Sequence, residues 1–227
     1  MQSNIAARVR GAGIGVLAPV ALVATAGGAA HADAAAPQPL RATFQRHDVL
    51  AGAVVPVSGQ LLTHEGRRKV LVQMSTGHGW HTVARARTDA AGRFRTSFRP
   101  RTLGRLKLRV RLVGPSAGTS DINSTIAGTR HQHGAVTVYR ASTASWYGPG
   151  LYGGRTACGG TLNATTLGVA NRTLPCGTRV TFRYHGRKVT ATVIDRGPFV
   201  AGREWDLTPA VKARLGFPST GTVWATA

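Results

Sequence analysis

The chain has 227 residues, with 29 Lys or Arg against 8 Asp or Glu, and a formal net charge of +21. A charge of this size ordinarily indicates a nucleic-acid partner. The N-terminus argues against that role, because residues 1–32 read as an export signal: a basic head, an uncharged run over 11–28, and the Ala30-His31-Ala32 pattern of a cleavage site. The run is too short and too rich in Gly and Ala for a transmembrane anchor. We therefore expect a secreted protein without a stable membrane anchor and without a nucleic-acid partner.

The positive charge belongs to the exported part of the chain, because residues 1–32 contain only two of the arginines and no acid. Scattered Lys and Arg side chains attract phosphate without geometric selectivity. Anionic polymers of the cell wall and acidic membrane surfaces are the candidate partners. The alternative is that the charge serves only solubility.

Strand and turn patterns dominate residues 41–139. The segment Leu106–Val113 alternates apolar residues with Lys107, Arg109 and Arg111, which predicts a half-buried strand with a basic outer face. Further strands are expected over 69–74, 80–88 and 93–98, separated by turns that contain Gly or Asp. Strands at this spacing predict a small β-sandwich. The pattern resembles immunoglobulin-like modules of bacterial cell-surface proteins, which implies a spacer or an adhesion module.

No metal site and no cofactor are expected in this region. Its histidines are spread over different loops and strands without a recognised ligand spacing; they are His64, His78, His81, His131 and His133. The pair His131 and His133 comes closest to a ligand pattern, but it ends a segment, 116–134, that reads as a mobile surface loop.

A second domain is expected over residues 143–227, directly after the sandwich, with Arg140–Ser142 as the hinge. Its two cysteines, Cys158 and Cys176, are the only ones in the chain. An even pair in an exported protein predicts a disulfide, which by loop entropy is worth about 3 kcal/mol. Two reactive free thiols are the alternative.

The local pattern of this domain places a carboxylate at the end of a strand. Apolar residues alternate along 188–193, and the strand delivers Asp195 to a turn over 196–198. Thr208 before Pro209 predicts a helix start, and Gly216 its end. Asp206 is expected near the positively polarised start of that helix.

Asp195, Glu204 and Asp206 are the only carboxylate side chains after Gly134. Their concentration in one segment predicts a cleft with selected acids. Two structural alternatives remain open: Asp195 forms a buried ion pair with Arg196 or Arg203, and Asp206 only caps the helix or orders the loop. Glu204 is expected to be solvated surface, paired at most with Arg203.

Three segments in the second domain resemble the double-psi β-barrel of the rare lipoprotein A family. They are ASWYGPGLYGGRTACGGTLN, ANRTLPCGTRVTFRYHGRKVTATVIDRGPF and GREWDLTPAVKARLG, in this order from Ala144. The resemblance, which extends more distantly to expansins and barwin-like proteins, implies a six-stranded barrel. It also implies an extracytoplasmic location and action on, or binding to, the glycan strands of peptidoglycan.

The chain departs from the enzymes of that family at two positions. Their segment T-A-N-G-E corresponds to TACGG here, so Gly160 stands where they carry a catalytic Glu, and Asn171 stands where they carry His. Asp195 matches their remaining acid. One acid can suffice for a lytic transglycosylase, because the sugar's own C6 hydroxyl is the nucleophile. Asp195 and Asp206 also match the paired aspartates of expansins, which loosen glycan networks without hydrolysis.

Three functions are therefore weighed. The first is a wall protein that binds or loosens peptidoglycan glycan, the second is a lytic transglycosylase with Asp195 as acid and base, and the third is a purely structural barrel. Asp195 and Asp206 are the candidate catalytic residues. The candidate substrate contacts are polar and aromatic residues around them, with Trp146 either in the core or beside the sugar: Ser145, Tyr147, Tyr152, Asn171, Phe199 and Trp205. The protein is expected to act as a monomer.

Overall fold

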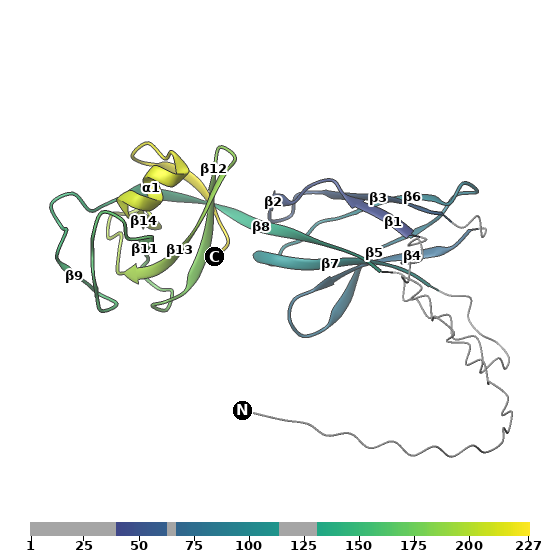
Figure 1. The fold of residues 1–227 in the computed structure, drawn as a ribbon, viewed down its shortest axis with the longest axis horizontal. Coiled ribbons are helices and arrows are strands. Elements are labelled where there is room, and N and C mark those ends of the chain that lie inside the picture. The colour runs from purple at the N-terminus through teal and green to yellow at the C-terminus, as the bar shows by residue number, and fades with distance from the viewer. Residues whose placement is uncertain (1–39, 63–66, 114–130) are drawn as a thin grey trace, which may run out of the picture. The chain divides into compact units, whose positions relative to one another are not determined.

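The computed structural model describes residues 40–62, 67–113 and 131–227 (Figure 1). The expected export signal, His64 and most of the expected loop over 116–134 lie outside these residues. The described part is mainly β, with fifteen strands and one helix. Within it, no helix combines the length and apolar character needed to cross a membrane.

The first strands form a β-sandwich of two sheets. One sheet has the order β1-β3-β6, all antiparallel, with bounds β1 (Leu40–Phe44), β3 (Val55–Leu61) and β6 (Arg93–Phe98). The other has the order β5-β4-β7-β8, with bounds β5 (Trp80–Arg87), β4 (Lys69–Ser75), β7 (Gly104–Leu112) and β8 (His131–Trp146). The short strand β2 (Asp48–Leu50) pairs in parallel with β8. The predicted sandwich is confirmed, whereas its immunoglobulin-like class stays a prediction.

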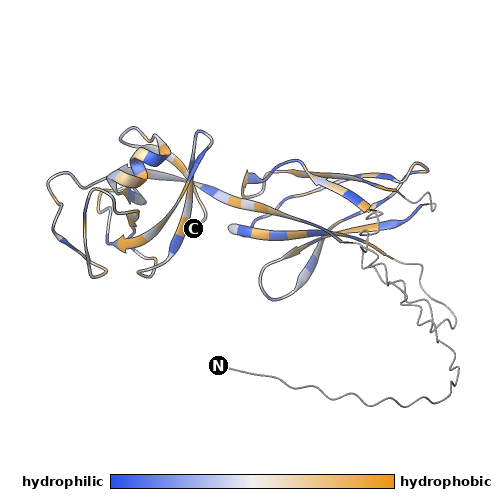
Figure 2. Ribbon diagram, in the orientation of Figure 1, coloured by the Kyte–Doolittle hydropathy of each residue, from blue (hydrophilic) through white to orange (hydrophobic). Residues whose placement is uncertain are grey.

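Alternating sequence builds this sandwich. Along β7, Leu106, Leu108 and Val110 are buried, while the intervening basic residues lie on the other face. The same alternation of hydrophilic and hydrophobic residues is visible along the strands in Figure 2. One apolar core joins the two sheets, with contributions from Phe44, Val57, Phe94, Val72, Leu108 and Val136. The basic outer face predicted for β7 is thus confirmed.

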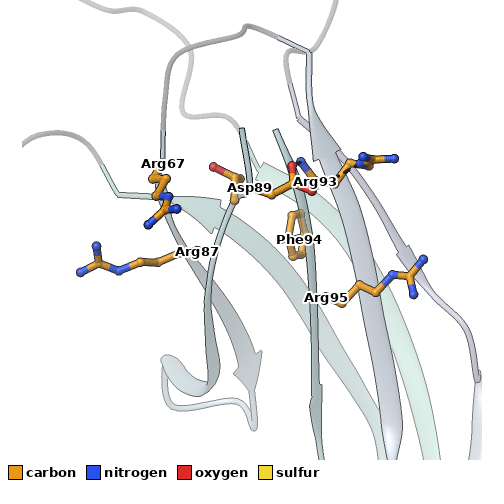
Figure 3. Close-up of a pocket in the computed structure, with 7 residues that line it drawn as sticks. Arg67, Arg87, Asp89, Arg93, Phe94 and Arg95 are labelled. Carbon is orange, nitrogen blue, oxygen red and sulfur yellow. Dashed lines mark hydrogen bonds and ion pairs between the residues drawn. The ribbon is translucent and has the colours of Figure 1, made fainter. Parts of the chain in front are cut away.

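A hollow opens at one edge of the sandwich, between the ends of β5 and β6. It has a volume of about 450 Å³ and contains one acid among its lining residues, Asp89. Figure 3 shows the arginines around it, Arg67, Arg87, Arg93 and Arg95, with Phe94 between them. Asp89 accepts hydrogen bonds from the backbone N–H of Ala91 and Arg93 at the turn, so its carboxylate is part of that turn.

Strand β8 continues from the sandwich sheet into a closed barrel. The barrel order is β8-β14-β11-β13-β12-β15, and β15 pairs back with β8. Its other strands are β11 (Gly168–Ala170), β12 (Arg179–Tyr184), β13 (Arg187–Asp195), β14 (Trp205–Leu207) and β15 (Gly221–Ala225). A hairpin of β9 (Arg155–Thr156) and β10 (Gly160–Thr161) lies outside this ring. The predicted six-stranded barrel is confirmed.

The expected hinge is not a loop. Arg140, Ala141 and Ser142 lie within β8, where they pair in antiparallel register with Ala225, Trp224 and Val223 of β15. The chain therefore passes from sandwich to barrel in continuous strand conformation, because the backbone hydrogen bonds of these three residues complete the barrel wall.

The barrel interior is apolar and well packed. Trp205 and Phe182 lie at its centre, fully buried, with ring centroids 5.0 Å apart in an edge-to-face arrangement. Small and branched residues surround them, among them Ala144, Val169, Val180, Val193, Leu207 and Val223. This core fixes the ends of the strands that carry the acids.

Helix α1 (Pro209–Leu215) covers part of the barrel and matches the prediction at both ends. Thr208 is the N-cap residue and Pro209 occupies the first turn, as expected. Gly216 ends the helix at φ +63°, and a Cβ there would lie 2.7 Å from the Arg187 guanidinium. The Thr208 hydroxyl does not cap the helix; it donates instead to the carbonyl of Thr166, at 2.6 Å.

Candidate functional site

Two acids flank one residue of a central strand. Ala170 at the end of β11 pairs on one side with Asp195 of β13 and on the other with Asp206 of β14. Asp206 in turn pairs with Ser145 of β8. Neighbouring strands lie about 4.8 Å apart, so the Cα atoms of the two aspartates are separated by roughly 10 Å. The two acids thus lie in one row across four strands of the barrel, and the cleft expected around them stays a prediction.

A bulge in β13 sets this register. Val169 pairs with Val193, but the next residue, Ala170, pairs with Asp195, so Ile194 is the additional residue. Ile194 packs over Gly168, where a Cβ would overlap its side chain. Bulges re-aim the residue that follows them and are common beside active sites. Here the bulge places Asp195, in place of Ile194, opposite Ala170.

The backbone holds the Asp195 carboxylate in position. Its Oδ1 accepts hydrogen bonds from the N–H of Ala157 and from the N–H of Arg196, each at 2.9 Å. Among the described residues, the salt bridges do not include Asp195. The alternative of a buried ion pair with Arg196 or Arg203 is therefore not observed. Asp195 is only partly buried, so it can be reached by a ligand.

Asp206 is held by a side chain. The hydroxyl of Ser145, which is only 3% exposed, donates to Asp206 Oδ1. The helix N-terminus has no side-chain cap and no acid in its first turn. The alternative in which Asp206 caps the helix is therefore not observed, because the residue lies within β14 and its carboxylate accepts a hydrogen bond from Ser145 of β8. Ser145, predicted as a substrate contact, instead orients the second acid.

Tyr147 follows β8 and brings a phenol to the two acids. Its backbone N–H donates to the carbonyl of Leu207, at 3.0 Å. Burial raises the pKa of Tyr147 well above its usual value, and the charges of Asp195 and then Asp206 raise it further. Within the described part of the chain, no hydrogen-bond partner of ordinary geometry satisfies its buried hydroxyl. The phenol therefore keeps its proton beside two carboxylates.

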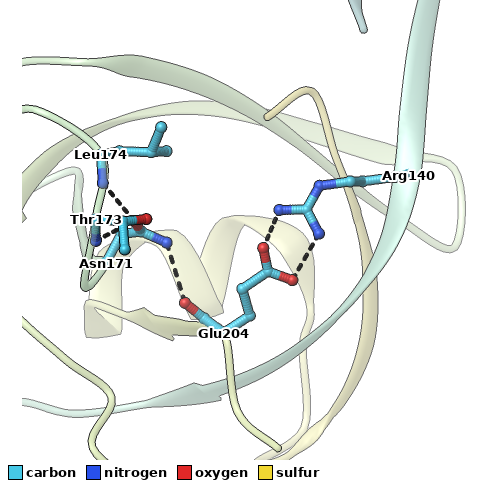
Figure 4. Close-up of polar contacts among 5 residues, drawn as sticks. All are labelled: Arg140, Asn171, Thr173, Leu174 and Glu204. Atoms are coloured by element: carbon cyan, nitrogen blue, oxygen red, sulfur yellow. Dashed lines mark hydrogen bonds and ion pairs between the residues drawn. The ribbon is translucent and has the colours of Figure 1, made fainter. Parts of the chain in front are cut away.

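Asn171 and Glu204 belong to a polar network with Arg140, Thr173 and Leu174 (Figure 4). The Asn171 amide donates to the Glu204 carbonyl at 3.2 Å, and its Oδ1 accepts from the N–H of Thr173 and Leu174. Arg140 forms a two-pronged ion pair with the Glu204 carboxylate, one contact being Nη1 to Oε2 at 2.7 Å. Asn171, predicted to contact substrate, is only 5% exposed and organises its own loop.

The prediction for Glu204 is wrong in its partner. Its carboxylate binds Arg140 on β8, not Arg203, and its side chain is 31% exposed. This pair joins the segment before β14 to β8, beside the backbone bond from Glu204 N–H to the Thr143 carbonyl. Glu204 therefore supports the position of β14 and leaves Asp195 and Asp206 as the acids of the site.

The predicted disulfide is present. Cys158 and Cys176 are bonded, with Cα atoms 5.6 Å apart, and both neighbouring segments attach to the end of β13. The Cys158 N–H donates to the Ile194 carbonyl, and the Gly177 N–H to the Val193 carbonyl. The bond lies one residue from Ala157, whose N–H holds Asp195. The cross-link thus fixes part of the cradle around the first acid.

A hollow of about 430 Å³ lies beside the disulfide, against Thr192–Ile194 of β13. Gly160 lines it, and the nearest atom to a Cβ at that position would be Thr156 Oγ1, 3.9 Å away. Position 160 therefore has room for a side chain beside β13. Hydroxyls of Thr156, Thr161 and Thr166 line the same hollow, so its surface is partly polar.

The predicted aromatic contacts divide by exposure. Phe199 is 81% and Tyr152 44% exposed, so both can stack on a sugar. Trp205 is fully buried against Phe182, which argues against the stacking role expected for it. Trp146 is partly buried, with the Lys212 ammonium 4.4 Å from its ring centroid. The contacts with substrate themselves stay predictions.

Residues 139–226, which form the closed six-stranded barrel, are an RlpA-like double-psi β-barrel domain. Residues 139–226 match a family model described as lytic transglycolase. The domain is similar to a probable endolytic peptidoglycan transglycosylase RlpA of Synechocystis, with 45% identity over 38% of this chain and 28% of the relative. It is similar to an endolytic peptidoglycan transglycosylase RlpA of Campylobacter jejuni, with 43% identity over 35% of this chain and 30% of the relative.

A third relative matches over a longer stretch. An endolytic peptidoglycan transglycosylase RlpA of Neisseria meningitidis is 29% identical over 68% of this chain and 59% of its own length. The chain thus spans less than a third of the first two relatives and less than two thirds of the third. The matches concern chiefly the barrel domain.

Sequence patterns did not reveal three parts of the site. The Ala157 N–H is a backbone donor, which has no side-chain signature. The buried environment of Tyr147 and the Arg140–Glu204 pair, whose partners are 64 residues apart, depend on how the barrel closes. The ASWYG segment offered a signal for Tyr147, since it ends β8 beside Ser145.

Proposed function

We propose that this protein is an extracytoplasmic wall protein whose barrel binds, and thereby loosens, the glycan strands of peptidoglycan. The observation that carries this proposal is the placement of Asp195 and Asp206 on either side of Ala170, each partly exposed and each held by a donor. Oriented carboxylates accept hydrogen bonds from sugar hydroxyls. The exposed rings of Tyr152 and Phe199 offer faces on which sugars can stack.

The absence of a side chain at Gly160 favours binding over cleavage. Glycoside cleavage uses an acid that protonates the leaving oxygen and commonly a second carboxylate at a defined separation. By strand spacing, the Cα atoms of the two aspartates are roughly 10 Å apart. Gly160 stands at the position of the family's catalytic Glu, and it has no side chain that could donate a proton. Binding needs neither a proton donor nor that second acid.

A lytic transglycosylase is the second candidate function, favoured by the similarity to endolytic peptidoglycan transglycosylases. In its acid form, the Asp195 side chain would give its proton to the glycosidic oxygen. It would then take a proton from the C6 hydroxyl as that oxygen attacks C1, which closes an anhydro sugar and releases the glycan end.

The proposed location rests on independent features. The disulfide suits an oxidising compartment outside the cytoplasm, and residues 1–32 have the pattern of an export signal. The excess of Lys and Arg favours anionic wall polymers as a second partner.

One experiment separates the two candidates. Purified mature protein is incubated with isolated sacculi, and both the bound fraction and the soluble anhydro-muropeptides are measured. The proposal expects retention on sacculi without release of anhydro-muropeptides, and Asp195→Asn should lower that retention by about tenfold or more. Release that disappears in Asp195→Asn would establish the enzyme instead.

The matched control is Asp89→Asn, which removes one negative charge in the sandwich turn and leaves the barrel unchanged. Asp89→Asn should bind sacculi no more weakly than the unmodified protein. If Asp195→Asn and the unmodified protein are equal in both binding and release, neither candidate function uses this acid.

A further inference from the structure

Three neighbouring strands of the sandwich carry an outer face made of cations. Strands β5, β4 and β7 contain no Asp or Glu. Their registers pair Leu71 with both Arg85 and Arg111, and Gln73 with Arg109, so these side chains share the face opposite the core. We call the following seven residues the cationic face, six of them exposed and Arg109 partly buried: Lys69, Arg85, Arg87, Arg105, Lys107, Arg109 and Arg111.

Carboxylates of the described residues do not neutralise this face. The nearest acid in the same sheet is Asp48 of β2, which is separated from β7 by β8. Asp48 already binds Lys188 Nζ, at 3.0 Å, and accepts from the Tyr139 hydroxyl. The like charges of the face therefore repel one another in the free protein and favour a negatively charged ligand.

A cluster in the middle of the face holds one guanidinium in place. The Arg109 guanidinium lies 4.2 Å from the ring centroid of Trp80, and its Nε donates to Gln73 Oε1 at 2.8 Å. The ring of His133 packs edge-on against Trp80, with centroids 6.2 Å apart. A guanidinium fixed in this way loses less conformational freedom on binding than a mobile one.

Because the cationic face is long, it favours a polymer with many negative charges over a single anion. Arg105, Lys107, Arg109 and Arg111 alternate along β7, so the row they form is about 20 Å long at 3.3 Å per residue. The hollow lined by Arg67, Arg87, Arg93 and Arg95 continues the positive charge around the edge of the sheet (Figure 3). Arginine predominates, and its planar fork matches the oxygens of phosphate groups.

The surface chemistry of the face disfavours two other polyanions. Binding at a membrane is strengthened by apolar side chains that insert between lipids. The exposed large apolar residues of the described chain lie elsewhere: Leu62, Leu151, Tyr152, Phe199 and Val200. Single-stranded nucleic acid is bound through aromatic rings that stack on bases. The one aromatic ring of the face, Trp80, is already covered by Arg109 and His133.

We propose that the cationic face binds a linear phosphodiester polymer, of the kind in which phosphate groups link polyols along the main chain. The polymer lies across β5, β4 and β7 and places its phosphates against the alternating cations. This partner is distinct from the glycan proposed for the barrel. The binding does not depend on Asp195 or Asp206.

The test measures binding of the full mature chain to a poly(glycerol phosphate) chain at low and at physiological ionic strength. The face variant combines Arg85→Gln, Lys107→Gln and Arg111→Gln. The matched control removes three exposed cations that lie off the face, Arg41→Gln, Arg101→Gln and Arg214→Gln. Thermal unfolding of each variant reports whether it is folded.

Each removed cation should weaken binding by up to about fivefold at low ionic strength, so the face variant should bind up to roughly 100-fold more weakly. The control variant should lose much less, and inorganic phosphate should compete only weakly. Asp195→Asn should bind the polymer normally even if it no longer binds sacculi, which separates this proposal from the function of the barrel. Equal losses in the face and control variants would overturn the proposal. Tighter binding to vesicles of anionic lipid than to the polymer would also overturn it.

Discussion

Asp195 and Asp206 pair with the same residue, Ala170, from opposite sides of strand β11. The two acids are eleven positions apart in the chain, yet the bulge at Ile194 and the short strand β14 bring them into one row. Each acid has its own support. Backbone N–H groups hold Asp195, whereas the Ser145 hydroxyl holds Asp206. A change to one support should therefore affect one acid more than the other.

Replacement of Ser145 by Ala tests the support of Asp206. The variant removes the hydroxyl that donates to Asp206 Oδ1 in a site that is only 3% exposed. We expect the free energy of unfolding to fall by about 1–2 kcal/mol, because a hydrogen bond to a charged group is lost. Retention on sacculi should fall less than in Asp195→Asn. Urea unfolding and the sacculus assay measure the two effects.

Ser145→Thr is the control, since it keeps a hydroxyl on β8 while adding a methyl group. If Ser145→Ala unfolds at the same urea concentration as the unmodified protein, the hydrogen bond to Asp206 does not contribute to stability. If Ser145→Ala binds sacculi less well than Asp195→Asn, Asp206 is the dominant acid of the site.

Replacement of Gly160 by Glu tests whether a missing acid limits the barrel to binding. Residue 160 is exposed in β10. A Cβ at this position would lie 3.9 Å from its nearest neighbour, Thr156 Oγ1, so the backbone can accept the side chain. We expect Gly160→Glu to release anhydro-muropeptides from sacculi above the level of the unmodified protein. A general acid contributes about 100-fold or more to such a reaction.

Gly160→Gln has nearly the same size and cannot donate a carboxylic proton, which makes it the matched control. The double variant Gly160→Glu with Asp195→Asn should be inactive. Equal release by the Glu and Gln variants would mean that a carboxylic acid at this position does not provide the missing chemistry.

Removal of the disulfide should loosen the cradle of Asp195. Replacing Cys158 and Cys176 by Ser opens the loop that the bond closes, and by loop entropy the free energy of unfolding should fall by about 3 kcal/mol. Retention on sacculi should also fall, since Ala157 next to Cys158 donates to Asp195. Denaturant unfolding and sacculus binding, measured with and without reductant, provide the check.

Reductant should affect only the unmodified protein, because the variant has no disulfide to lose. Stability that is the same in the variant and the oxidised protein would contradict the role of the cross-link. Lower stability with unchanged sacculus binding would show that the Ala157 contact survives without it.

Much of the architecture was predictable because it follows local patterns. The alternation of apolar and polar residues along Leu106–Leu112 and 188–193 predicted strands with one buried face. The pattern of Thr208, Pro209 and Gly216 predicted both ends of α1. The disulfide followed from an even cysteine pair in an exported chain. In each case the signal lies within a few residues or in the cysteine count. The prediction therefore did not require knowledge of contacts between distant segments.

The misjudged residues are those whose role depends on barrel closure. The position of Trp205 next to an acid suggested an aromatic contact with sugar. Strand β14 lies between β8 and β11, however, and the Trp205 ring is buried in the barrel core. Glu204 has Arg203 next to it, yet the wall brings Arg140 closer. Asp206 precedes a helix in the sequence, but it pairs with Ser145 of β8, whose hydroxyl donates to its carboxylate. Neighbours in sequence predicted these contacts poorly because the partners lie on other strands.

The phenol of Tyr147 makes stability depend on pH in the alkaline range. Burial, and then the charges of Asp195 and Asp206, raise the pKa of Tyr147 in the folded protein above the value of about 10 expected in the unfolded chain. The folded state therefore retains a proton that the unfolded state loses. This contribution to stability is fully present below pH 10 and is lost as the pH rises above 10 toward the folded pKa.

Tyr147→Phe removes the ionisable group, so the variant should lose less stability between pH 9 and pH 11 than the unmodified protein. The limit is about 1.4 kcal/mol per pH unit for one proton, and burial of Tyr139, whose pKa is raised in the same direction, leaves part of the alkaline loss in place. Urea unfolding at the two pH values measures the difference. Tyr152→Phe, which removes a phenol that is 44% exposed, is the matched control. An alkaline loss of stability that is equal in Tyr147→Phe and the unmodified protein would mean that burial and the two acids do not raise the pKa of this phenol in the folded barrel.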